Sequence, residues 1–281
     1  MSESRYQPIK AYKNEVFLNS QDARVLRILA EYLEPKSRFE EFRVRDTIVF
    51  FGSARVLPND VAKERLEEAK RDGGDVAKAE RNLRMSRYYE ETRELASRLT
   101  EWSKSLEGSE QRFVVCSGGG PGIMEAANKG ASEAKGENIG LNISLPFEQN
   151  DNRYITRRLS FEFHYFFMRK FWFSYLAKAM IIMPGGFGTL DEFMEVVTLV
   201  QTFKIKKRLP IVLYGTEYWD QVLNFEPMVR FGTISPEDPD MFLRTDSVDE
   251  AYEYIVKELE EHALKKSADE PAGEPDEFLT A

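Results

Sequence analysis

The chain has 281 residues, of which 42% are hydrophobic and 31% are charged, and its formal net charge is −9. This length suffices for one large domain with its own core, and fits that better than two small ones. The acidic balance argues against DNA or RNA as a partner, whereas local backbone dipoles can still bind a small anion.

The cysteine content and the pattern of apolar residues indicate the cellular compartment of the protein. Cys116 is the only cysteine, so no disulfide framework can form, which is typical of a reducing compartment. The first ten residues lack the apolar core of a secretory signal. Charged residues interrupt the apolar stretch 161–182, which predicts a buried helix followed by a buried strand and no membrane span. We therefore expect a cytoplasmic protein.

The N-terminal third is predicted to begin with an arm over residues 1–20 and an amphipathic helix over 21–33, with Val25, Leu26, Ile28, Leu29 and Leu33 on one stripe. A short apolar run, Thr47–Phe51, predicts a buried strand. Charges of both signs over 58–84, around Gly73 and Gly74, indicate an exposed helical hairpin or a mobile excursion. A longer helix is expected over 83–105.

From residue 112 onward, strands and helices alternate. We expect strands at 112–116, 138–145, 179–183 and 210–214, with a weaker extended piece at 159–163. The expected helices cover 122–135, 166–177, 189–203, 217–231 and 248–264. This alternation predicts an α/β fold with a parallel sheet covered by helices on both faces. The predicted organisation is an arm and helix over 1–45, a single domain over 46–265 that includes the insertion 58–84, and a disordered acidic tail over 266–281.

Two glycine-containing loops follow predicted strands, where ligands bind in open parallel sheets. Gly52 and Ser53 form a turn that could approach a ligand, with Arg55 nearby, although a plain tight turn is as good an interpretation. The run 117–122 contains Gly119 and Gly120 before a helix that carries Glu125 and Asn128 on one face. A phosphate or sugar at this helix N-terminus explains the glycines, and the alternative is a turn with solvated polar residues.

A third loop, 184–192, opens a helix after the apolar strand 179–183. Gly185, Gly186 and Gly188 allow backbone N–H groups to converge on an anion, and Thr189 adds a hydroxyl. The loop lacks the lysine of a P-loop and the glycine spacing of a dinucleotide fingerprint. It is therefore predicted to bind phosphate.

Two charged residues near this loop have alternative interpretations. Thr189 and Glu192 have the spacing of a capping box, in which the glutamate only caps the helix. Next to Asp191, however, Glu192 could instead face a sugar beside the phosphate. Arg169 lies in a helix that is apolar almost all round, so it either forms a structural ion pair or faces a polar pocket.

Taken together, these motifs resemble one known family. The stretch 184–192 matches P-G-G-x-G-T-x-x-E, and Met168-Arg169-Lys170 and the segment 117–128 precede it. The sequence from about residue 47 to 214 is similar to the LOG family, the cytokinin riboside 5′-monophosphate phosphoribohydrolases, often labelled "lysine decarboxylase-like".

This resemblance implies a Rossmann-like, doubly wound fold, a homodimer or larger homo-oligomer, and hydrolysis of the N-glycosidic bond of a nucleoside 5′-monophosphate without metal or cofactor. It implies a catalytic pair, Arg169 and Glu192. It also implies phosphate binding by Gly185, Gly186, Gly188 and Thr189. Ribose and base contacts would come from seven positions: Gly52, Ser53, Gly119, Gly120, Glu125, Asn128 and Met168.

Other functions remain open. A non-catalytic carrier of a phosphorylated cofactor, such as a molybdenum-cofactor carrier, needs the glycines but not the pair of Arg169 and Glu192. A dinucleotide-dependent oxidoreductase is disfavoured because the turn after residue 51 lacks the three-glycine spacing. A true decarboxylase needs a lysine in Schiff-base linkage to pyridoxal phosphate, and no lysine stands out for that role.

Overall fold

The computed structural model describes residues 8–108, 110–144 and 152–264. Their strands form one parallel sheet in the order β4-β3-β2-β1-β5-β6-β7, which confirms the predicted Rossmann-like α/β class. The strands are β1 (Thr47–Phe51), β2 (Val114–Ser117), β3 (Asn138–Ile143), β4 (Ser160–Phe163), β5 (Ala177–Ile182), β6 (Ile211–Tyr214) and β7 (Leu243–Thr245).

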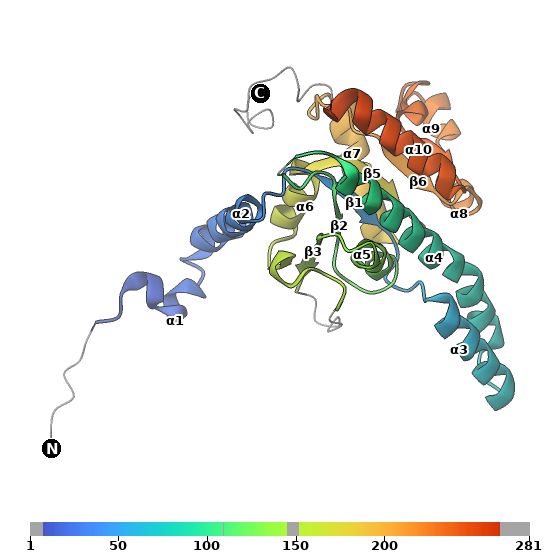
Figure 1. The fold of residues 1–281 in the computed structure, drawn as a ribbon, viewed down its shortest axis with the longest axis horizontal. Helices are drawn as coiled ribbons and strands as arrows, with labels where there is room; N and C mark the ends of the chain where they lie inside the picture. Colours follow the sequence, from blue (N-terminus) through green and yellow to red (C-terminus); the bar gives the residue numbers. More distant parts are fainter. Residues whose placement is uncertain (1–7, 109, 145–151, 265–281) are drawn as a thin grey trace.

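Helices cover both faces of this sheet (Figure 1). The helices before β3 are α1 (Glu15–Leu18), α2 (Arg24–Glu41), α3 (Asn59–Asp72), α4 (Val76–Ser105) and α5 (Ile123–Glu133). Those after β4 are α6 (Phe166–Tyr175), α7 (Phe187–Gln201), α8 (Thr216–Val222), α9 (Glu226–Arg230) and α10 (Val248–Leu259). Short 3-10 turns lie at Ala11–Lys13, Arg157–Leu159 and Asp238–Met241, and a π-helical turn lies at Glu260–Leu264.

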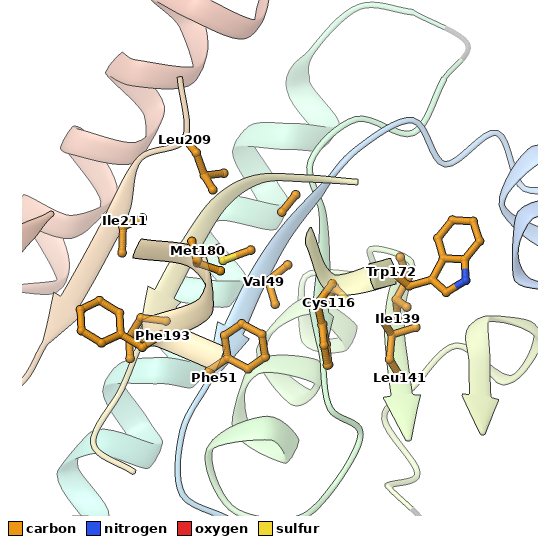
Figure 2. Packing of buried hydrophobic residues seen from close by; sticks show 14 of the residues in the cluster. Val49, Phe51, Cys116, Ile139, Leu141, Trp172, Met180, Phe193, Leu209 and Ile211 are labelled. Atoms are coloured by element: carbon orange, nitrogen blue, oxygen red, sulfur yellow. The ribbon is translucent and has the colours of Figure 1, made fainter. Parts of the chain in front are cut away.

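The central strand β1 shows why a continuous apolar run predicts a buried strand. Ile48 and Phe50 face the cluster formed with α4, α5 and α10, whereas Val49 and Phe51 face the cluster formed with α6 and α7. Figure 2 shows the second cluster, in which Cys116 packs as a small apolar side chain. Alternate residues of one strand therefore fill two cores, as a sheet covered on both faces requires. None of the described helices is both long and apolar enough to cross a bilayer.

The N-terminal helix differs from expectation. Helix α2 begins three residues later than predicted and continues to Glu41 through Pro35. Of the predicted apolar stripe, Ile28 packs against the core, whereas Val25, Leu26, Leu29 and Leu33 are exposed. Periodicity correctly predicted an apolar face but not that this chain leaves most of it uncovered. Together α1 and α2 extend away from the sheet (Figure 1).

The charged insertion forms a helical hairpin, the first of the two predicted alternatives. Helix α3 ends at Gly73, whose φ of 71° is a left-handed conformation that favours glycine. The second arm does not end at residue 84 but merges with the expected helix 83–105 into the single long helix α4. The hairpin extends beyond the sheet at the end opposite α2 (Figure 1).

The C-terminal third contains two corrections. The expected helix 217–231 is split into α8 and α9. Helix α8 ends at Val222, and a new helix begins at Glu226 with Pro227 in its first turn, where a missing N–H is tolerated. Strand β7 was not predicted, since it has three residues and one of them is Arg244. The predicted acidic tail lies outside the described residues.

Candidate active site

The order in which strands are added to the sheet reverses between the parallel neighbours β1 and β5. Starting from β1, the chain adds β2, β3 and β4 toward one edge of the sheet, and then β5, β6 and β7 toward the other edge. Ligands bind at the carboxyl ends of strands at such a switch point. A cavity of about 1380 Å³ lies there, and its walls include the loops that follow β1, β2 and β5.

The loops after β1 and β5 are joined by backbone hydrogen bonds. The Met183 N–H donates to Phe51 O at 2.8 Å, and the Ser53 N–H donates to Pro184 O at 3.0 Å. Gly52, Ser53 and the exposed Arg55 line the cavity, as expected for the first of these loops. Gly52 is required by packing, because a Cβ at this position would lie 2.5 Å from a side-chain carbon of Ile123.

The predicted phosphate loop opens helix α7 directly at the cavity. Gly185, Gly186, Gly188 and Thr189 all line it. A Cβ on Gly185 would lie 2.1 Å from Thr189 Oγ1, so only glycine fits. Gly186 is the N-cap, and the first helical hydrogen bond shown at this end runs from the Leu190 N–H to its carbonyl at 3.0 Å. The N–H groups of the preceding first turn therefore remain for an anion.

The position of Thr189 excludes the capping-box interpretation. The helix begins at Phe187, two residues before the predicted start, so Thr189 is the third helical residue and not the N-cap. No side chain caps this end of the helix. Glu192 therefore lies in the second turn, where its carboxylate does not satisfy the helix N-terminus.

Glu192 lies in the cavity wall and is only 6% exposed. Burial raises the pKa of its carboxyl to about 7, although Lys170 and Arg169 lower it and Glu195 and Asp191 add to the rise. A carboxyl with a pKa near neutrality can exchange a proton at physiological pH, which suits a general base.

Arg169 faces Glu192 from the neighbouring helix α6. Its Nη2 lies 3.9 Å from Glu192 Oε1, and both side chains are largely buried. The guanidinium also lies over the rings of Phe166 and Phe173, at 5.1 Å and 5.7 Å from the ring centroids. Because all four side chains line the cavity, the ion pair lies in the binding space and not behind it.

Asp191 takes no part in the cavity wall. Its carboxylate accepts from Lys170 Nζ at 2.8 Å and its side chain is 58% exposed. Of the two adjacent acids, only Glu192 therefore lies where it would repel a bound phosphate, and it is paired with Arg169.

Some predicted ribose and base contacts are not in the cavity. Gly120 lines it, but Gly119, Glu125, Asn128 and Met168 do not. Gly119 has a φ of 74°, and a Cβ there would lie 2.1 Å from Asn142 Oδ1. It therefore allows close packing of the loop. Met168 is buried in the hydrophobic cluster between the sheet and α6.

The two polar residues of α5 bind other parts of the protein. Glu125 accepts a hydrogen bond from the Tyr89 hydroxyl at 2.7 Å. Asn128 is fully buried and accepts from Ser117 Oγ at 2.6 Å and from Asn152 Nδ2 at 3.0 Å. Its amide nitrogen donates to Asn138 Oδ1 and Ile139 O. These bonds use its hydrogen-bonding capacity, so Asn128 supports the loop after β2.

Several cavity residues were missed by sequence reasoning. Asn142 is the second-last residue of β3, Phe166 and Phe173 are on α6, and Tyr218 is on α8. The Tyr218 hydroxyl donates to Gly185 O at 2.7 Å and so fixes the phosphate loop from the opposite side. The strand was predicted over 138–145, which places Asn142 inside it and hides its position near the true end of β3. Nothing in the sequence marks Tyr218 as a cavity residue.

Comparison with known sequences supports the motif-based assignment. A family model described as "Possible lysine decarboxylase" matches residues 124–255, which include both Arg169 and Glu192. The Arabidopsis thaliana protein cytokinin riboside 5′-monophosphate phosphoribohydrolase LOG3 is 29% identical over 154 residues, or 53% of this chain and 67% of that protein. The predicted resemblance to the LOG family is confirmed.

Other relatives cover less of their own length. The Arabidopsis thaliana phosphoribohydrolase LOG1 is 36% identical over 86 residues, and LOG7 is 34% identical over 88 residues. Each alignment spans 38% of the relative, and they cover 30% and 31% of this chain. The LOG names thus describe hydrolases, whereas the family model's description names a decarboxylase.

Two solved structures align with most of this chain at low identity. The molybdenum cofactor binding protein of Rippkaea orientalis aligns with a TM-score of 0.47 and 16% identity, over 76% of this chain and 97% of that one. The Moco carrier protein of Chlamydomonas reinhardtii gives 0.43 and 17%, over 77% and 99%. Likeness of this degree does not distinguish a carrier from an enzyme.

Proposed function

We propose that this LOG-like chain hydrolyses the N-glycosidic bond of a nucleoside 5′-monophosphate, releasing free base and ribose 5-phosphate. AMP or an N6-modified AMP is the preferred substrate. The observation that carries the proposal is the pair of Arg169 and Glu192 in the wall of a cavity that also contains the N-terminus of α7. Binding alone requires the helix end, whereas a nearly buried carboxyl with a pKa of about 7 beside it suits a general base.

The phosphate holds the substrate in register. Its oxygens accept hydrogen bonds from the first-turn N–H groups of α7, at Gly186, Gly188 and Thr189. The ribose then extends from the loop toward Glu192, one helical turn further along α7. Fixing the sugar in this way converts binding energy into alignment of C1′ with the reacting groups.

Hydrolysis proceeds through a transition state with positive charge on the ribose ring. The ionised Glu192 stabilises this charge and accepts a proton from the attacking water. The water oxygen bonds to C1′ while the C1′–N bond breaks, and the electron pair of that bond leaves with the base. The base nitrogen takes up the proton that Glu192 accepted from water, so Glu192 is ionised again. Arg169 orients the Glu192 carboxylate and offsets its charge beside the phosphate.

A second candidate is storage or transport of a phosphorylated cofactor. The cavity of about 1380 Å³ exceeds the roughly 300–1,000 Å³ of common small-molecule pockets, so it has room for a ligand larger than a mononucleotide. This candidate uses the same phosphate loop and assigns Arg169 and Glu192 only to binding.

A substrate panel separates the two. The protein is incubated with AMP, GMP, CMP, UMP and N6-prenylated AMP, and with adenosine, and free base and sugar phosphate are separated by chromatography. We expect base release from at least one nucleotide and much less from adenosine, because the nucleoside lacks the anchoring phosphate. Tight AMP binding with no base release from any compound would favour the carrier.

A further inference from the structure

Lys170 follows Arg169 on α6 but contacts different carboxylates. Its Nζ lies 2.8 Å from Asp191 Oδ2 and 2.6 Å from Glu195 Oε2, both on α7. Asp191 and Glu195 are four residues apart and so lie on one face of the helix. Lys170 therefore bridges the two acids that flank Glu192 in sequence.

The bridging ammonium group is itself largely buried. Its side chain is 17% exposed, and a buried ammonium is stable only when it is paired. Burial lowers the pKa of Lys170, but hydrogen bonds to Asp191 and Glu195 more than offset this, so the pKa is raised overall. Lys170 thus remains a positive charge at neutral pH.

This charge matters for Glu192 because α7 places three carboxylates within two turns. Asp191 and Glu195 both raise the pKa of Glu192, and Lys170 opposes them more strongly than Arg169 does. The two cations act from different directions. Arg169 faces Glu192 within the cavity, and Lys170 neutralises the acids beside it.

We propose that Lys170 is a positioning residue for the proposed hydrolysis: by bridging Asp191 and Glu195, it keeps Glu192 ionised and directed at the cavity near neutral pH. This inference rests on the proposed function, because it matters for catalysis only if Glu192 acts as a base. Arg55, Glu162 and Tyr218 are the other titratable groups that line the cavity among the described residues, and the test leaves them unchanged.

The test measures kcat/KM for AMP from pH 5 to pH 9. In Lys170→Met, we expect the acidic limb of the profile of kcat/KM against pH to move to higher pH by roughly one unit. Loss of a neighbouring opposite charge raises the pKa of a carboxyl by about this amount. Activity then falls about tenfold at pH 6 but stays within about twofold of the parent at pH 9. Lys170→Arg restores the parent limb, since a guanidinium can bridge the same acids.

Matched variants separate charge from folding. Asp191→Asn with Glu195→Gln, in the presence of Lys170, moves the limb to lower pH, and adding Lys170→Met to that pair returns it toward the parent position. If Lys170 only holds α6 against α7, its replacement lowers activity by the same factor at every pH. An unmoved limb in Lys170→Met, with reduced activity throughout, overturns the inference.

A substrate-free measurement keeps this result distinct from the proposed function. Carbon-13 NMR follows the titration of the Glu192 carboxyl, assigned with Glu192→Gln, in the parent and in Lys170→Met. A higher midpoint in Lys170→Met supports the bridge even if no nucleotide is cleaved, in which case only the proposed hydrolysis fails. Identical midpoints reject the bridge even if AMP is cleaved.

Discussion

The side chain of Glu192 combines near-complete burial with a place in the cavity wall. Its pKa lies near 7 because burial disfavours the charge more than Lys170 and Arg169 favour it. The folded protein therefore prefers the protonated carboxyl, and its stabilising contribution is complete below the ordinary value of 4.5. That contribution is lost as the pH rises to about 7.

We predict that Glu192→Gln stabilises the protein at pH 8 and has little effect at pH 4.5. At about 1.4 kcal/mol for each pH unit, the rise in pKa corresponds to about 3 kcal/mol. Urea unfolding at both pH values measures the difference. A Glu192→Gln variant that is less stable than the parent at pH 8 would contradict the assigned burial cost. The expected gain in stability with a loss of activity is a common trade-off at functional sites.

Tyr218 allows a test of how the loop at the N-terminus of α7 is held in place. Tyr218→Phe removes the hydrogen bond to Gly185 O and leaves the ring in place. Since such a bond contributes about 1 kcal/mol, we expect KM for the nucleotide to rise about fivefold with kcat changed less. The control is Tyr254→Phe on α10, which does not line the cavity. A fall in kcat at constant KM would mean that Tyr218 acts on the reaction and not on the loop.

At the scale of elements, β1 and β2 are joined at their amino ends by a buried ion pair. Asp46 is fully buried, accepts from Arg112 Nε at 2.7 Å, and also accepts from the Phe113 N–H at 2.5 Å. The pair lies at the opposite end of the strands from the cavity. It stabilises the sheet register without contacting the ligand.

We predict that Arg112→Met destabilises the protein by about 3 kcal/mol or more, because it leaves the Asp46 charge buried and uncompensated. Thermal and urea unfolding measure the loss. The double variant with Asp46→Asn is expected to lose less, since it removes the stranded charge. Equal losses in the two variants would show that packing of the arginine stem, and not the charge, accounts for the effect.

The sequence predicted helices and strands more accurately than it predicted side-chain contacts. The continuous apolar run Thr47–Phe51 gave the bounds of β1, because a strand buried on both faces needs apolar side chains throughout. Strand β7 lacks that pattern. Glycine spacing located a loop of the cavity wall, 184–192, whose binding of phosphate stays a prediction. The family motif supplied Arg169 and Glu192 as a pair. The contacts of Asn128 and Lys170 depend on which face of one helix meets another element, which sequence spacing alone does not specify.

At the scale of the whole molecule, the arm formed by α1 and α2 leaves an apolar face uncovered. Val25, Leu29 and Leu33 are all exposed on α2, and Phe166 and Phe167 are exposed on the adjacent α6. Phe166 also lines the cavity, so a molecule seated on this face would reach the mouth of the site. Because the family resemblance implies a homo-oligomer, we propose a second copy of the chain as the occupant.

This proposal predicts a particle of about twice 32.6 kDa by light scattering coupled to size exclusion. Leu29→Glu should reduce it to the monomer mass, because a buried unpaired carboxylate opposes association. Phe231→Glu, at an exposed apolar position next to α9, should leave the dimer intact. A parent protein that is monomeric at micromolar concentration, or a dimer unaffected by Leu29→Glu, would reject this interface.

We propose that Arg169 and Glu192 together cleave a nucleotide that the N-terminus of α7 holds by its phosphate. The most direct measurement quantifies free adenine and ribose 5-phosphate from AMP with the parent protein, Arg169→Ala and Glu192→Ala, with AMP binding measured in parallel. We predict equimolar products from the parent, and at least about 10²-fold slower release in both variants, which still bind AMP. Release that is unchanged in Glu192→Ala, or a parent that binds AMP and releases no adenine, would contradict the account.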